Sequence, residues 1–292
     1  MLFLVQHKGI PMSTDSTTAR VPKPALSQAE LLYEAQQRQA RNFRRNVGLS
    51  WGILLLLLIY LFSGQSFLGI RTIRLDYEFI RNNIGFIAEG VPQTLLLSFV
   101  SIILATVLAL LTALGRLSTI APLYALSTFY VSLIRGTPLY LQIFFFFLAL
   151  PQIGIILSGF IAGVVALGMN YGAYMSEIFR AGLASVGKGQ REAALALGMT
   201  PWQTMKRVVL PQALRFAIPP IGNDFIAMTK DSALISATGF VQELTWRATR
   251  VGRAQFNNLE ALIIAAAFYW FMTIILTYIQ GIIEARLAKG DH

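Results

Sequence analysis

Residues 136–176 form a run of 41 residues without a charged side chain. Two further uncharged runs cover residues 46–70 and 90–115. A helix crosses the hydrocarbon core of a bilayer with about 20 apolar residues, so each run is long enough to span it and the longest exceeds one helix. Only 13% of the 292 residues are charged and the mean hydropathy is +0.60, whereas soluble domains carry about 25% charged residues. The sequence therefore predicts an integral membrane protein.

An all-α, polytopic fold with about six transmembrane helices is expected. The turn-forming stretch LPQIG at 150–154 divides the longest run into two spans. Residues 204–230 combine charged side chains with three prolines, which predicts a broken interior span, because freed backbone groups in a membrane need partners from protein or a watery cavity. The expected spans are residues 48–63, 90–115, 122–149, 154–182, 204–230 and 261–283.

The basic residues predict the orientation of these spans. Lys and Arg accumulate on the cytoplasmic side of membrane helices. With both termini inside, 14 of the 24 Lys and Arg residues fall in inner segments and six in outer segments. Residues 1–45 are expected to be a cytoplasmic tail, partly disordered by composition, within which Met12 is an alternative start to Met1.

Residues for metal or nucleophilic chemistry are scarce. The chain has no cysteine and two histidines, His7 and His292. No nucleophile–base pair and no metal cluster is recognisable, so no catalytic residue and no metal ligand is assigned and a membrane enzyme is disfavoured. The phosphate-binding pattern G-x-x-x-x-G-K-[ST] is also missing.

A charged, alanine-rich segment lies between the apolar runs. Its stretch REAALAL at 191–197 contains strong helix formers, and Gly198 stands where a left-handed cap would end the helix. Thr200, Pro201 and Gln203 match a capping box that starts a new helix. These residues alone are equally consistent with a docking element and with a loop helix packed on its own spans.

The same segment carries a longer pattern. Glu192-Ala193-Ala194 is followed after three residues by Gly198, and after nine more by Val208-x-Leu210-Pro211. With Val in place of Ile at 208, this resembles the signature of permease subunits of binding-protein-dependent ABC importers. The stretches 132–147, 170–183 and 210–234 are similar to the polar amino acid branch, and the similarity runs from about residue 88 to 288.

The resemblance implies a domain organisation. Residues 88–288 would form the five-helix core of a type I ABC importer, preceded by the tail and by an extra transmembrane helix with its outer loop at 46–87. Residues 188–199 would be the coupling helix that docks on an ATP-binding subunit. Glu192 is the preferred docking contact, with a pair to Lys188 or a solvated charge as its alternative. The coupling residues are Glu192, Ala193, Ala194, Gly198, Leu210 and Pro211.

The resemblance also implies partners. This chain would bind no cofactor, and ATP and Mg²⁺ would lie on two separate ATP-binding subunits. A second permease subunit, identical or paralogous, would complete the pathway in the bacterial inner membrane, with both termini cytoplasmic. An extracytoplasmic solute-binding protein would deliver the substrate to the outer loops, and no nucleic acid is expected. Which amino acid is transported is not readable from the chain.

Ionisable residues inside spans are costly and usually face an interior cavity. Arg135 precedes Gly136-Thr137-Pro138, where a proline frees carbonyl groups, and is expected to line the pathway and pair with a substrate carboxylate. Gln142, seven residues on, would share its helix face. The alternative for Arg135 is an arginine that snorkels to lipid headgroups. The candidate pathway residues are Arg135, Thr137, Gln142, Asn223 and Asp224.

An ion pair within one span is also expected. Glu177 and Arg180 are three residues apart on one span and should form a structural ion pair. The alternative function is an ion-coupled secondary amino acid transporter, for which broken helices and buried charges would also suit. No convincing inverted repeat supports that alternative.

Overall fold

The computed structural model describes residues 28–67 and 70–288, almost all of them helical. The chain forms two compact units, Met1–Leu75 and Asp76–His292. The all-α prediction is confirmed, whereas the expected disorder of the tail falls largely on residues 1–27, which lie outside the described residues. The second unit begins at Asp76, earlier than the core boundary expected at residue 88, because helix α2 packs on helices of the core.

The first unit consists of one long helix and a small hairpin. Helix α1 (Gln28–Leu61) joins the end of the expected cytoplasmic tail to the first span without interruption. Its apolar side chains from Leu49 to Leu61 are exposed within this unit. Strands β1 (Ser66–Phe67) and β2 (Ile70–Arg71) pair antiparallel, with Ser66 opposite Arg71.

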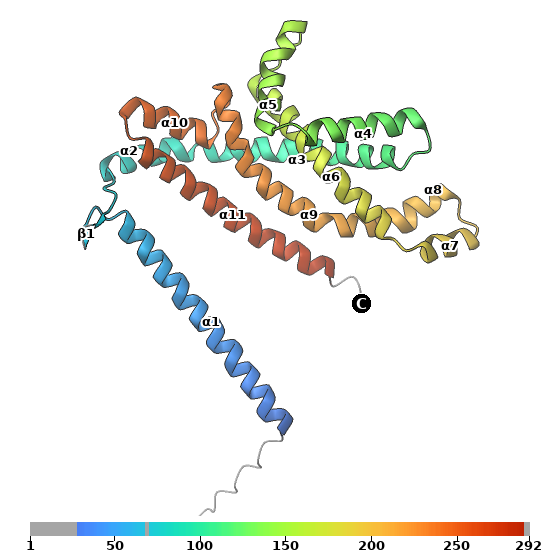
Figure 1. Cartoon of the computed structure of the whole chain (residues 1–292), viewed down its shortest axis with the longest axis horizontal. Coiled ribbons are helices and arrows are strands. Elements are labelled where there is room, and N and C mark those ends of the chain that lie inside the picture. Colours follow the sequence, from blue (N-terminus) through green and yellow to red (C-terminus); the bar gives the residue numbers. More distant parts are fainter. Residues whose placement is uncertain (1–27, 68–69, 289–292) are drawn as a thin grey trace, which may run out of the picture. The chain divides into compact units, whose positions relative to one another are not determined.

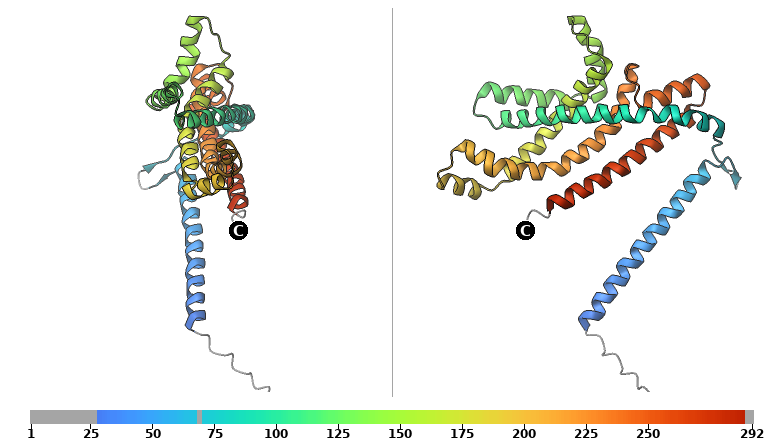
Figure 2. Two further views of the ribbon diagram at one scale, coloured as in Figure 1. Left: turned by 90° about the vertical axis from the view of Figure 1, so that its right-hand side faces the viewer. Right: turned by 180° about the vertical axis from the view of Figure 1, so that it is seen from behind.

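Four long helices lie side by side in the second unit (Figures 1 and 2). They are α3 (Gly90–Arg116), α6 (Gly159–Ser185), α9 (Leu210–Asp231) and α11 (Asn258–Ala288). Two short helices, α2 (Tyr77–Ala88) and α10 (Leu244–Gln255), lie at one end of this group, and α7 (Lys188–Ala196) and α8 (Pro201–Thr204) lie at the other (Figure 1).

Helix α6 is the interior helix of this unit. Fifteen of its 27 residues are buried, on all of its faces. Its glycines permit the close approach of neighbouring helices, as small residues do between membrane helices. A Cβ added at Gly168 would lie 2.6 Å from Leu104 of α3, and one at Gly182 would lie 3.0 Å from the carbonyl oxygen of Ala213 in α9.

Among the described residues, three helical stretches are long and apolar enough to cross a membrane by themselves: Ala35–Leu61, Tyr77–Arg116 and Asn258–Leu287. A bent pair, Ala121–Arg135 with Leu139–Ile153, makes a fourth. Helices α6 and α9 have the length of a span but a less apolar composition. Together these six elements are consistent with the expected six spans.

The span expected at 122–149 is not a continuous helix. Helix α4 (Ala121–Arg135) ends at Gly136, and a second helical stretch begins at Leu139, bent by 107° from the first. Proline disfavours helical geometry in the residue before it, and the break falls at Thr137-Pro138. The second stretch comprises α5 (Leu139–Phe144), the π-helix η1 (Phe145–Ala149) and the 3₁₀-helix η2 (Leu150–Ile153).

Two other boundaries were also predicted from proline and glycine. Gly154 is left-handed, with φ of 83°, which confirms the turn at LPQIG, although α6 starts only at Gly159. The predicted break in the fifth span is wrong, because α9 continues as one helix through Pro219 and Pro220. Gln280 of α11 donates a hydrogen bond to the carbonyl oxygen of Pro219 at 3.2 Å, so a neighbouring helix supplies a donor beside the prolines.

The Gln142 side chain forms hydrogen bonds with the backbone at the break between α4 and α5. Its Nε2 donates to the carbonyl oxygens of Ile134 and Thr137, at 2.8 and 3.1 Å, and to Thr137 Oγ1 at 2.8 Å. Asn170 of α6 donates to its Oε1 at 3.1 Å. Gln142 is buried and does not share a helix face with Arg135, since the helix ends between them. That part of the pathway prediction is wrong.

We expect Gln142→Leu to lower the free energy of unfolding by about 1–3 kcal/mol, because it leaves buried polar groups without their partner. Thermal unfolding in detergent would measure the change. Gln152→Leu is the matched control, since Gln152 is exposed and its amide makes only one long hydrogen bond, of 3.5 Å to the carbonyl oxygen of Leu148. Equal losses in both variants would contradict this role for Gln142.

Candidate functional site

Helix α7 and the turn that follows it form the first candidate site. Gly198 adopts φ of +80°, and the Met199 N–H donates to the carbonyl oxygen of Ala194 at 3.1 Å. The left-handed cap expected at Gly198 is therefore confirmed. Thr200 and Gln203 form the expected capping box, with distances of 3.2 and 2.9 Å between side chain and backbone. The helix ends at Ala196 rather than at residue 199.

The exposed face of α7 differs from the one expected. Ala194 is buried, with 4% of its surface exposed, so it packs inward and is unavailable to a partner. Glu192 and Ala193 are exposed, as a docking face requires. The pattern missed three exposed apolar side chains: Leu195, Leu197 and Trp202 are exposed by 49%, 81% and 71%. These side chains add exposed apolar surface that is close in the sequence to Glu192 and Ala193.

Helix α7 is connected to two of the long helices, α6 and α9. Arg191 donates from Nη2 to the carbonyl oxygen of Leu183 in α6. After the turn, α8 runs directly into the π-helix η3 (Met205–Val209) and then into α9. Leu210 and Pro211 start α9, and the Leu210 N–H reaches back five residues to Met205. Because proline has no N–H to donate, a π-turn before Pro211 accommodates the missing bond. A displacement of α7 would therefore move both α6 and α9.

Glu177 is the centre of a second candidate site. Its carboxylate accepts Arg116 Nη1 at 2.5 Å from the end of α3 and Arg180 Nε at 2.8 Å from its own helix. Arg135 Nη1, at the end of α4, lies 3.4 Å away, and its guanidinium lies 5.1 Å from the centre of the Tyr174 ring. The expected pair of Glu177 and Arg180 is confirmed, and it belongs to a cluster that joins three helices.

The remaining pathway candidates do not gather around Arg135. Arg135 is 41% exposed and directed to Glu177. Asn223 is exposed on α9, and Asp224 is half-buried with its Oδ2 atom unpartnered. No contact in the described part of the chain joins Arg135 to either residue. Their role as pathway residues remains a prediction.

Glu243 is a buried carboxylate that the sequence did not single out. It caps α10, accepting the Trp246 and Thr245 N–H groups at 2.6 and 2.8 Å, and it also accepts the Tyr269 hydroxyl of α11 at 2.8 Å. The residue lies between α9 and α11, outside the spanning helices. Burial raises its pKa to about 7. Glu243 thus fastens α10 to α11 at the end of the group opposite to α7.

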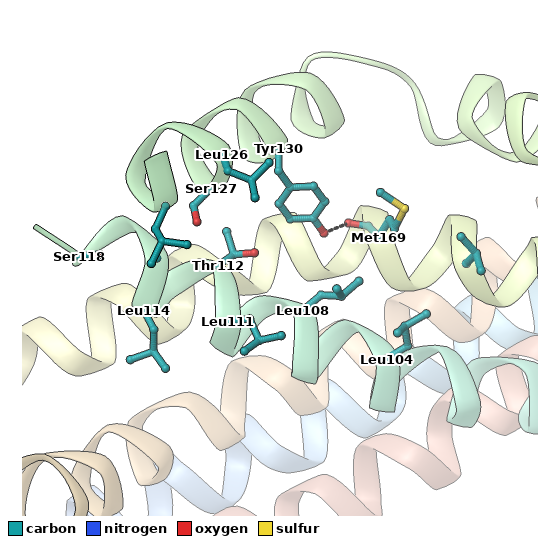
Figure 3. Close-up of a pocket in the computed structure, with 13 residues that line it drawn as sticks. Leu104, Leu108, Leu111, Thr112, Leu114, Ser118, Leu126, Ser127, Tyr130 and Met169 are labelled. Atoms are coloured by element: carbon teal, nitrogen blue, oxygen red, sulfur yellow. Dashed lines mark hydrogen bonds between the residues drawn. The ribbon is translucent and has the colours of Figure 1, made fainter. Parts of the chain in front are cut away.

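An apolar groove of about 750 Å³ lies between α3, α4 and α6 (Figure 3). Leu108 and Leu111 of α3 and Leu126 of α4 line it, and Tyr130 closes one side by donating to the carbonyl oxygen of Met169 at 2.6 Å. Such a lining is unsuited to a charged ligand. Across the described residues, no group of three or more His, Cys, Asp or Glu could hold a metal ion.

The chain is similar to a known protein family and to characterised relatives. Residues 105–289 match the family model of the binding-protein-dependent transport system inner membrane component. The chain is 41% identical over 218 residues to the arginine transport system permease protein ArtQ of Bacillus subtilis (strain 168), covering 74% of this chain and 99% of that protein. It is 43% identical over 204 residues to the L-cystine transport system permease protein TcyB of the same organism, covering 70% of this chain and 87% of that protein.

Solved structures agree. A crystal structure of an amino acid ABC transporter with histidines has a chain 36% identical, with a TM-score of 0.68, covering 73% of this chain and 99% of that one. A structure of the MetNI methionine ABC transporter in an inward-facing conformation matches with a TM-score of 0.59 at 21% identity, covering 70% and 96%. The second likeness shows the fold alone.

The buried Glu243 predicts a pH dependence of stability. Its folded-state pKa of about 7 lies above the ordinary value of 4.5 for a glutamate side chain, so the folded state binds the proton more tightly than the unfolded state does. Its contribution to the free energy of unfolding therefore falls as pH rises from about 4.5 to 7, by up to about 3 kcal/mol.

Thermal unfolding over this pH range would measure the effect. Glu243→Gln, which cannot titrate, should flatten the profile relative to the unmodified chain, and Glu78→Gln serves as the control in which the slope persists. An unchanged slope in Glu243→Gln would show that another group titrates.

Proposed function

The chain belongs to the family of binding-protein-dependent transport system inner membrane components, and on this premise we propose that it forms the translocation pathway for amino acids in an ATP-driven importer. The observation that carries the proposal is the α7 segment, in which a helix with an exposed face is connected to two of the long helices, α6 and α9. The relatives named for arginine and L-cystine transport support the amino acid as substrate class.

The proposed importer contains other subunits besides this chain. It has no phosphate-binding pattern, so ATP and Mg²⁺ belong to two separate ATP-binding subunits, and this chain is a non-catalytic subunit. A second permease, identical or paralogous, completes the pathway, and an extracytoplasmic solute-binding protein delivers the amino acid. The bacterial inner membrane holds the chain with both termini in the cytoplasm, as its basic residues favour.

The geometry supports a mechanical link from α7 to the pathway. When the ATP-binding subunits close on ATP, they displace α7. Arg191 carries the displacement to the end of α6, and the capped turn at Thr200 carries it through α8 to α9. The left-handed cap at Gly198 ends α7 at a fixed point. A push on α7 therefore displaces the helix as a rigid body and does not extend it into the next helix. An ion-coupled transporter has no use for such an element.

We also propose side chains that line the pathway and contact the substrate. Asp224, half-buried on α9 with an unpartnered oxygen, and the neighbouring exposed Asn223 are the candidates on the driven helix. Arg135 and Thr137 stand at the break between α4 and α5, where a bend of the helix would alter the pathway. Arg135 is already paired with Glu177. To bind a substrate carboxylate, it would have to bind both carboxylates at once or break its ion pair with Glu177.

Reconstituted transport tests the proposal. The complete complex in liposomes, supplied with its binding protein and internal ATP, should take up an amino acid. Leu197→Asp should lower the uptake rate by about tenfold or more, because an exposed apolar anchor at a partner's groove is replaced by a charge, while folding is retained since the side chain is 81% exposed.

Leu197→Met is the matched control and should retain uptake. Uptake by this chain alone without ATP would favour the ion-coupled transporter. Full activity of Leu197→Asp would remove α7 from the coupling surface.

A further inference from the structure

A small polar cavity lies at the end of the unit where α2 and α10 are found. Its volume is about 340 Å³, and its walls come from the start of α3, the start of α6 and the segment 240–247 that leads into α10. We call it the mouth cavity. Unlike the apolar groove in Figure 3, it is lined by charged and amide side chains as well as aromatic rings. Its size is that of a site for a small molecule.

Arg247 is held rigidly at the mouth cavity. Its Nη1 donates to Glu89 Oε2 at 2.6 Å and to the carbonyl oxygen of Phe86 at 3.1 Å. Its Nε donates to the carbonyl oxygen of Gln242 at 3.3 Å, and its guanidinium lies 4.9 Å from the centre of the Phe86 ring. The Arg247 side chain is only 15% exposed. The guanidinium is thus pre-positioned, which lowers the cost of binding a ligand.

Several polar atoms of the mouth cavity have no partner among the described residues. Arg247 uses Nε and Nη1, which leaves Nη2, and Glu89 uses Oε2, which leaves Oε1. The side-chain amides of Gln93 and Gln242 likewise make no hydrogen bond within the described chain. The cavity therefore presents a cationic donor and an anionic acceptor side by side, with two amides near them.

Adjacent opposite charges complement a compact zwitterion. The ammonium and carboxylate groups of a free amino acid are attached to the same carbon atom, so they need an acceptor and a donor that lie close together. The 2.6 Å pair of Glu89 and Arg247 offers this spacing. Charge-assisted hydrogen bonds of this kind are the stronger ones in proteins.

Aromatic walls complete the mouth cavity. Phe160 at the start of α6 is half-buried, and Phe240, at the end of the segment that follows α9, is 68% exposed. The Phe240 ring centre lies 4.8 Å from that of Phe147 in η1. These rings offer apolar contact to a side chain of varied shape, while the charges hold the part that all amino acids share.

We propose that the mouth cavity binds a free amino acid by its head, with Arg247 Nη2 donating to the carboxylate and Glu89 Oε1 accepting from the ammonium, as the substrate leaves the binding protein. This rests on the proposed function. The site recognises the α-amino acid head and does not select among side chains. It is separate from Arg135, Asn223 and Asp224.

Protection from thiol labelling tests this site without requiring transport. The chain has no cysteine, so Gln93→Cys places its only thiol in the mouth cavity. The complete complex in lipid nanodiscs, without binding protein, is treated with N-ethylmaleimide, and labelling of this subunit is followed by mass spectrometry. Each proteinogenic L-amino acid is added in turn at millimolar concentration. Ala254→Cys, exposed on α10 and outside the cavity, is the control thiol.

We expect one or more amino acids to slow labelling of the Gln93→Cys thiol and to leave the Ala254→Cys thiol unaffected. The deaminated acid and the decarboxylated amine of the same amino acid should protect more weakly, since each lacks one charge. Adding Arg247→Gln should raise the half-protecting concentration by about tenfold or more, because a charged donor is lost. Arg250→Gln, outside the cavity on the same helix, should leave it unchanged.

Absence of protection by every amino acid, in a complex that still imports one with its binding protein, would overturn the mouth site and leave the proposed function standing. Protection that persists in Arg247→Gln, or that affects both thiols equally, would also overturn it. If Gln93→Cys does not assemble, Gln242→Cys gives a second thiol in the same cavity. Protection in a complex that imports no amino acid would support the site and count against the proposed function.

Discussion

Water does not reach the hydrocarbon core of a bilayer, so backbone polar groups there need partners within the protein. This chain places a helix break and a double proline in its spanning region, and side chains donate hydrogen bonds to backbone carbonyl groups near both. Gln142 donates to the carbonyl oxygens exposed at the break between α4 and α5, and Gln280 donates to Pro219 of α9. Irregular backbone can therefore exist inside the group of helices, where a pathway needs bends and polar atoms.

The two ends of the second unit carry different features: an exposed apolar surface at one end and a polar cavity at the other. At one end, Leu197 just after α7 and Trp202 of α8 are exposed, while Arg191 holds α7 to α6. At the other, Glu243 fastens α10 to α11 beside a polar cavity. Helices α6 and α9 run between these ends, and their close glycine contacts transmit displacement rather than absorb it. The proposed docking surface and the proposed amino acid site thus lie at opposite ends of the same helices.

Local features were predictable and distant contacts were not. The cap at Gly198 and the capping box at Thr200 depend on a few neighbouring residues, and the pair of Glu177 with Arg180 on one turn of helix. The buried side of Ala194 depends on how α7 meets η3, and the pairing of Arg135 with Glu177 joins residues 42 positions apart. Periodicity placed Gln142 beside Arg135 because it assumed one helix, which the Thr137-Pro138 step interrupts.

The central claim is that the outward face of α7 touches an ATP-binding subunit. A photo-crosslinking amino acid placed at Ala193, in the native complex extracted from membranes, tests it most directly, with the buried position Ala194 as the internal comparison. We expect an ATP-binding subunit as the crosslinked product at Ala193 and little product at Ala194. Crosslinks from Ala193 only to this chain or to lipid would contradict it.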